Sequence, residues 1–111
     1  MTAGFDLERY LRHSKKVDVS DLDLSKARTY PLIKEVIRCL TYMMDIESHT
    51  IVYLRGILST CAIEDLETTA FLSCWAYEEF FHGRTLRRFL EQAGVRFSST
   101  RITEVQKSTS F

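Results

Sequence analysis

The sequence lacks a net charge, a long apolar run and a regular cysteine pattern, and each absence argues against a class of protein. With 15 basic and 15 acidic residues the net charge is zero, which argues against nucleic-acid binding through overall electrostatic attraction. No apolar run approaches the roughly 20 residues that a membrane-spanning helix needs. The three cysteines, Cys39, Cys61 and Cys74, have no C-x-x-C spacing, so neither a disulfide framework nor a zinc ribbon is expected.

The start of the chain also lacks a recognisable targeting signal. Its first ten residues, M-T-A-G-F-D-L-E-R-Y, contain no charged leader followed by an apolar core, which is the pattern of a secretion signal. Together with the unpatterned cysteines, this predicts a cytoplasmic location with reduced thiols. The length of 111 residues suits a single domain, and 45% apolar with 27% charged residues is ordinary for a globular protein.

What the sequence does contain is two long stretches of helical periodicity. Apolar residues recur at helical spacing between Leu32 and Leu58, which predicts a helix over about residues 32–59 with Pro31 in its first turn. A second helix is predicted over about residues 64–93, with an acidic start and a basic end that suit the helix dipole. Gly94 is placed to cap it, and residues 61–65 are the predicted turn.

The predicted fold is therefore all-α, a helical hairpin over residues 31–94 between an arm and a tail. The N-terminal arm, residues 1–30, is expected to contain a short helix at 5–13 and an extended segment at 14–29. The C-terminal tail, residues 95–111, has one weak helical patch at 102–106, and it could equally be the point at which a longer protein is truncated. Two amphipathic helices cannot cover each other's apolar stripes, so we expect a homodimer or a missing C-terminal half.

Three polar residues interrupt the apolar stripes of the predicted helices: Glu47 on the first, and Glu79 and His82 on the second. Residues three apart share a helix face, so Glu79 and His82 can bind one centre. A carboxylate within an apolar stripe is costly to bury unless it is paired, protonated or bound to a metal. One Glu plus one Glu-x-x-His is half of the ligand set of a di-iron helix bundle, and these oxygen and nitrogen donors suit iron or manganese.

Less specific interpretations exist for the same residues. Glu-x-x-His occurs often by chance, and Glu79 could simply hydrogen-bond to His82 within one helix. Glu47 has no basic residue three or four positions away, so a local ion pair does not explain it. Glu78 is turned by about 100 degrees from Glu79 and is expected on the outer face. His49 is off the face of Glu47 and is expected at the surface or its boundary.

The sequence around these residues resembles a known family. Residues 75–94, W-A-Y-E-E-F-F-H-G-R-T-L-R-R-F-L-E-Q-A-G, are similar to the second bundle helix of the ferritin-like acyl-carrier-protein desaturases. Residues 43–53, M-M-D-I-E-S-H-T-I-V-Y, are similar to the first bundle helix of that family. The resemblance covers roughly residues 32–94 and is specific at Glu47, Trp75, Glu79, His82 and Gly83.

The resemblance implies a ferritin-like, di-iron, oxygen-dependent oxidoreductase that desaturates an acyl chain bound to an acyl carrier protein. It also implies that Glu47 is a terminal iron ligand, Glu79 a bridging ligand and His82 the nitrogen ligand. The family carries a second helix pair with another Glu and another Glu-x-x-His. Beyond Gly94 this sequence has no His, and Glu104 is its only carboxylate side chain. The second half-site must therefore come from elsewhere for a dinuclear centre to form.

Two other functions fit the same residues. Two copies could build one bundle, as in the short encapsulated ferritin-like proteins, and act as a homodimeric, ferroxidase-like iron-binding protein. Alternatively, the hairpin could be a non-catalytic helical interaction module. An elongated apolar channel beside the metal would favour the desaturase, a symmetric interface would favour the iron-handling dimer, and an outward-facing Glu79 would favour the module.

Overall fold

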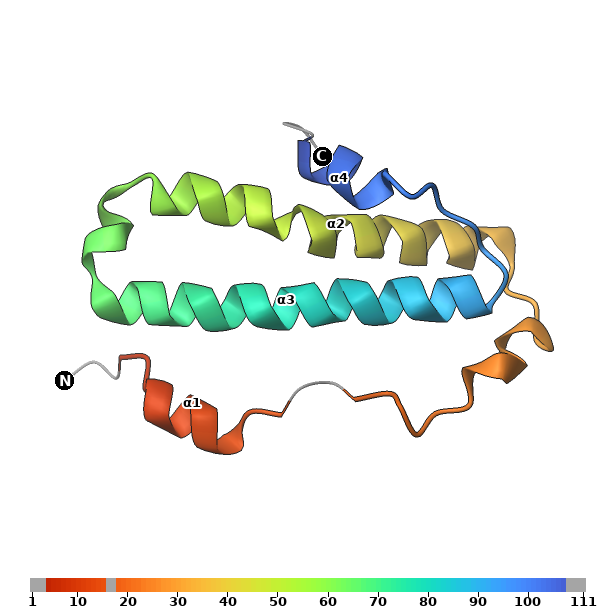
Figure 1. Ribbon diagram of the computed structural model, residues 1–111, viewed down its shortest axis with the longest axis horizontal. Helices are drawn as coiled ribbons and strands as arrows, with labels where there is room; N and C mark the ends of the chain where they lie inside the picture. The colour runs from red at the N-terminus through yellow and green to blue at the C-terminus, as the bar shows by residue number, and fades with distance from the viewer. Residues whose placement is uncertain (1–3, 16–17, 108–111) are drawn as a thin grey trace.

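In the computed structural model, which describes residues 4–15 and 18–107, every element is helical (Figure 1). The four α-helices are α1 (Leu7–His13), α2 (Lys34–Leu58), α3 (Leu66–Gln92) and α4 (Arg101–Lys107), and two short 3-10 helices are η1 (Leu24–Arg28) and η2 (Cys61–Glu64). The described residues contain no strand. The predicted all-α class is thus confirmed, and α2 and α3 form the two long helices that the periodicity indicated.

The first long helix begins later than predicted. Pro31 lies outside α2, which starts at Lys34 after Ile33. Ile33 has an extended backbone with φ −69° and ψ 154°, and its carbonyl accepts the first helical hydrogen bonds, from the amides of Val36 and Ile37. The fixed φ of proline fits an extended segment as well as a helical turn, so the placement of Pro31 in the first turn was wrong.

The second long helix, α3, lies within the predicted residues 64–93 and has the predicted start and glycine cap, but its last turn contains no basic residue. Asp65 caps its start by accepting a hydrogen bond from the Thr68 amide, which satisfies one of the free N–H groups of a first turn. At its end Gly94 has a φ of +97°. The Gly94 amide donates to the Glu91 carbonyl and the Val95 amide to the Leu90 carbonyl, which is the Schellman arrangement that favours glycine.

The arm and the tail lie on opposite sides of this hairpin, with α1 beside α3 and α4 beside α2 (Figure 1). Helix α1 lies within the predicted residues 5–13 and α4 spans the predicted patch at 102–106. The expected extended segment is correct only in part, because residues 24–28 form η1. Asp23 caps that turn by accepting a hydrogen bond from the Ser25 amide, a local contact that periodicity does not reveal.

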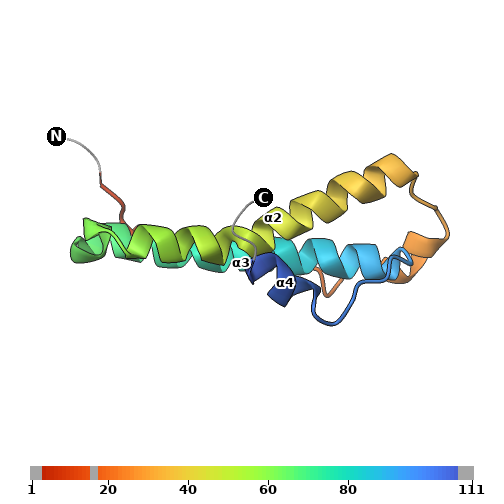
Figure 2. The same ribbon diagram turned by 90° about the horizontal axis from the view of Figure 1, so that it is seen from above.

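The two long helices run antiparallel beside one another near η2 and diverge toward the start of α2 (Figure 2). Few of their apolar side chains are buried: among the described residues these are Met44, Leu72 and Leu90. The radius of gyration is 16.9 Å, whereas a compact domain of about 100 residues has roughly 13 Å. The molecule is therefore elongated and has little core. None of its described helices is both long enough and apolar enough to cross a membrane.

Candidate metal centre

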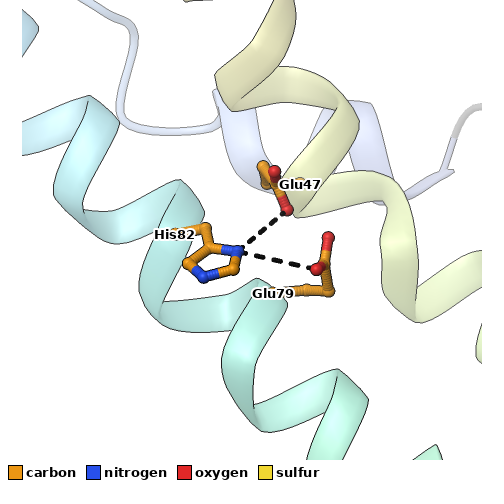
Figure 3. A group of neighbouring side chains, drawn as sticks. All are labelled: Glu47, Glu79 and His82. Atoms are coloured by element: carbon orange, nitrogen blue, oxygen red, sulfur yellow. Dashed lines mark ion pairs between the residues drawn. The ribbon is translucent and has the colours of Figure 1, made fainter. Parts of the chain in front are cut away.

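The structure brings together all three residues that the sequence singled out (Figure 3). Glu47 projects from the middle of α2, while Glu79 and His82 project from adjacent turns of α3. The His82 Nδ1 lies 3.8 Å from the Glu47 Oε2 and 3.5 Å from the Glu79 Oε1. One donor atom from each residue lies within 4.8 Å of the others. The cluster joins two helices, so it is more than a local contact between Glu79 and His82.

Close approach of the two helices at this point depends on Gly83. The residue is buried, and a Cβ atom added to it would lie 3.2 Å from the Cβ of Glu47 and 3.5 Å from the Oγ of Ser48. A side chain at this position would therefore push α2 away from α3. Because Gly83 follows His82 directly, the absence of a side chain brings Glu47 within reach of the imidazole.

The environment of Glu47 disfavours its charge. Its side chain is 20% exposed. Burial is the largest cause that raises the pKa of Glu47 from 4.5 to about 7, and the hydrogen bond to Glu79 and the charge of Glu79 add to the increase. Its Oε2 is buried and has no hydrogen-bond partner. A buried acceptor without a donor is costly, and here it faces a second carboxylate and an imidazole. A cation between these groups would compensate both the missing partner and the repulsion.

The donor spacing agrees with a single bound ion. Two ligands at about 2.0–2.2 Å from one metal lie at most about 4.4 Å apart. Both distances from the His82 Nδ1 are below this limit, and the 4.8 Å span of the whole cluster needs only a small closure. After this closure the three residues could offer one divalent transition metal two oxygen donors and one nitrogen donor.

Glu78 lies outside the cluster, as expected, but it is not simply solvated. Its Oε2 lies 4.0 Å from the Nε2 of His82, and its Oε1 accepts a hydrogen bond of 2.6 Å from the Tyr10 hydroxyl. This hydrogen bond raises the pKa of Tyr10. The contact comes from the arm, and it was not predicted from the sequence, because the two residues are 68 positions apart.

Two buried polar residues near Glu47 were not identified from the sequence. His49 is 3% exposed, so the prediction that it lies at the surface or its boundary was wrong. Its ring packs edge-on against the ring of Tyr53, with 5.1 Å between the ring centroids. Asp45 is 9% exposed. Both carboxylate oxygens of Asp45 accept from Arg101 on α4, from Nε at 2.9 Å and from a terminal nitrogen at 2.5 Å. The only sequence feature that could have indicated the burial of Asp45 is its position in the otherwise apolar run M-M-D-I.

A cavity of about 330 Å³ adjoins the cluster on the side of α4. Its walls come from α2, α3 and α4, and Glu47 is one of its lining residues. The remaining lining is largely apolar, with two arginines, and comprises Met44, Ser48, Thr50, Ile51, Ala76, Phe80, Gly83, Arg84, Arg87, Ile102 and Gln106. The site thus combines a polar cluster with an adjacent apolar space.

No family model, curated protein or solved structure matches this chain.

Proposed function

We propose that this chain carries half of a dinuclear iron centre, with Glu47, Glu79 and His82 as the ligands of one half-site. The observation that carries the proposal is the buried Oε2 of Glu47, which has no hydrogen-bond partner and lies 3.8 Å from the Nδ1 of His82. A cation is the simplest group that could satisfy this oxygen and offset the repulsion between two carboxylates. The mixed oxygen and nitrogen donors favour iron or manganese over soft-metal alternatives.

The activity that we propose is that of an oxygen-dependent oxidoreductase like the acyl-carrier-protein desaturases. When bound, a di-iron centre supplies the activation of dioxygen for oxidation of an unreactive C–H bond. The residues of this chain would hold the ligand geometry, and the 330 Å³ cavity offers apolar side chains such as Met44, Ile51 and Phe80 beside Glu47. That cavity supports an apolar substrate such as an acyl chain. Delivery by an acyl carrier protein rests on the sequence resemblance alone.

A second function, an iron-handling homodimer with ferroxidase-like activity, is supported by the shape of the molecule. The chain is elongated and leaves many large apolar side chains exposed, among them Met43, Ile51 and Phe80 at 44%, 48% and 64%. A second copy could cover this surface and contribute the other half-site. The third interpretation, an interaction module, has less support, because the Glu79 side chain is 21% exposed and faces Glu47 and His82 instead of solvent.

Anaerobic calorimetric titration with iron(II) tests the proposal. We expect the wild-type chain to bind iron(II), and Glu79→Ala and His82→Ala each to weaken binding by more than about tenfold, because each removes a donor. Glu91→Gln is the matched control, since Glu91 lies on the same helix and pairs with Arg87 at the surface. A folded wild-type chain without measurable iron(II) binding would refute the metal site.

Two separate assays then distinguish the desaturase from the iron-handling dimer. One detects unsaturated acyl product, and the other follows the oxidation of iron(II). Product formed from an acyl-carrier substrate with iron, reductant and oxygen would favour the desaturase. Iron(II) oxidation without such product would favour the iron-handling dimer.

A further inference from the structure

We infer that the N-terminal arm is part of the metal site: Tyr10, acting through Glu78, positions the imidazole of His82. The inference rests on the proposed function, because it concerns a residue that we assign as a ligand. Tyr10 and Glu78 do not touch the metal position in this arrangement. They are positioning residues, and neither was recognised from the sequence.

Three neighbouring side chains, Tyr10, Glu78 and His82, lead from the arm to the cluster. The Tyr10 hydroxyl donates to the Glu78 Oε1 at 2.6 Å, and the Glu78 Oε2 lies 4.0 Å from the His82 Nε2. The other ring nitrogen of His82, Nδ1, faces Glu47 and Glu79. The imidazole therefore stands between the metal-binding carboxylates on one side and Glu78 on the other.

The chemistry of a histidine ligand explains why Glu78 matters. Binding a metal through Nδ1 requires a neutral imidazole with its proton on Nε2. Metal-bound histidines usually donate this proton to a carboxylate, a carbonyl or a water, which determines the tautomer and the ring orientation. Glu78 is the carboxylate within reach. At 4.0 Å the contact is longer than a hydrogen bond, and a small rotation or one bridging water would complete it.

Tyr10 restricts the rotation of the Glu78 side chain. A glutamate on a helix surface samples several rotamers, and holding one of its oxygens leaves the other directed at His82. Tyr10 is itself held, because Phe5, just before α1, docks on α3. The Phe5 ring packs edge-on against Phe71 at 5.4 Å, and the Phe5 amide donates to Glu67. Docking of the arm and orientation of His82 are thus coupled.

Four variants of the full chain test the inference: Tyr10→Phe and Glu78→Gln, with Tyr30→Phe and Glu91→Gln as matched controls. Tyr30 is 74% exposed, and Glu91 forms a surface ion pair. Each variant is titrated with zinc(II), a diamagnetic ion that accepts histidine and carboxylate ligands. We expect Glu78→Gln to weaken binding by about 10–100-fold. Tyr10→Phe should weaken it by a smaller factor, and the controls should match the wild type.

Nitrogen-15 spectra of the zinc-loaded protein separate positioning from general stability. In the wild type we expect the Nε2 proton of His82 to be observable and protected from exchange, since it donates toward Glu78. That proton should shift and exchange faster in both test variants while thermal melting stays close to the wild type. Tyr10→Phe removes one hydroxyl, so it keeps the inference testable if Glu78→Gln folds poorly.

The outcomes distinguish this inference from the proposed function. If the wild type binds zinc(II) and both test variants bind it equally well with an unchanged His82 spectrum, the inference is wrong and the metal site stands. If the wild type binds neither zinc(II) nor iron(II), both are wrong. Equal losses in the test variants and the controls would also overturn the inference.

Discussion

At the scale of single residues, the raised pKa of Glu47 makes stability depend on pH. The pKa of about 7 in the folded chain exceeds the ordinary 4.5, so folding favours the protonated form. The resulting stabilisation is fully present below pH 4.5 and is lost as the pH rises through about 7. We expect the Tm of the metal-free protein to fall across this window, and Glu47→Gln to reduce that fall.

The metal affinity should change in the opposite direction, because the ion competes with the proton on Glu47. Iron(II) or zinc(II) binding should strengthen as the pH rises toward 7. Melting curves with and without metal over this range measure both effects. A Tm slope identical in the wild type and in Glu47→Gln would show that this carboxyl does not carry the pH dependence.

Gly83 supports a second prediction at the residue scale. In Gly83→Ala the new methyl group would lie 3.2 Å from the Glu47 Cβ, and forced overpacking costs about 1–3 kcal/mol. The intrinsic gain of about 1 kcal/mol from replacing a helical glycine with alanine would only partly offset this. We expect lower metal affinity and no gain in stability.

Gly56→Ala is the control for this prediction, since a Cβ at Gly56 meets nothing within 4 Å. It should stabilise the chain by up to about 1 kcal/mol and leave metal binding unchanged. Chemical denaturation and metal titration measure the two quantities. Unchanged metal affinity in Gly83→Ala would mean that the helices can separate without disturbing the cluster.

At the scale of elements, α4 is held to α2 by the Asp45–Arg101 pair. Helices of seven residues are marginal on their own, so α4 depends on tertiary contacts, and this ion pair is one of them. Arg101→Met leaves Asp45 buried without its cation, and such losses cost up to about 3–5 kcal/mol. The cost here should be nearer 1–2 kcal/mol, because the Arg101 side chain is 34% exposed.

Hydrogen exchange checks the consequence for α4. We expect its amides to lose protection in Arg101→Met and to keep it in Lys107→Met, a change of the same type in the last turn of α4. Ile102 and Gln106 line the cavity, so release of α4 should also increase the binding of an apolar dye. Full protection of α4 in Arg101→Met would show that apolar contacts alone hold it.

At the scale of the whole molecule, the small core predicts self-association. Met44, Leu72 and Leu90 are the buried apolar side chains among the described residues, whereas large apolar residues are exposed along both long helices. Exposed apolar surface of this extent marks an interface or an aggregation-prone surface. We expect light scattering after gel filtration to give a mass above that of one 13.0 kDa chain. A compact monomer with a sharp cooperative melt would contradict this.

The sequence by itself determined the helical class, the two long helices and the three residues of the cluster. Helical periodicity depends on local spacing, and a polar residue in an apolar stripe is visible wherever that stripe packs. The late start of α2, the η1 turn and the burial of His49 could not be derived in this way. Each depends on particular backbone or packing contacts that periodicity does not record.

The tertiary structure alone decided the surroundings of the cluster. The Asp45–Arg101 and Tyr10–Glu78 contacts join residues 56 and 68 positions apart, and one sequence carries no signal for such pairs. The role of Gly83 likewise appears only when α2 lies against it. Helical periodicity arises from interactions a few residues apart, whereas these contacts depend on how the arm and the tail pack on the hairpin.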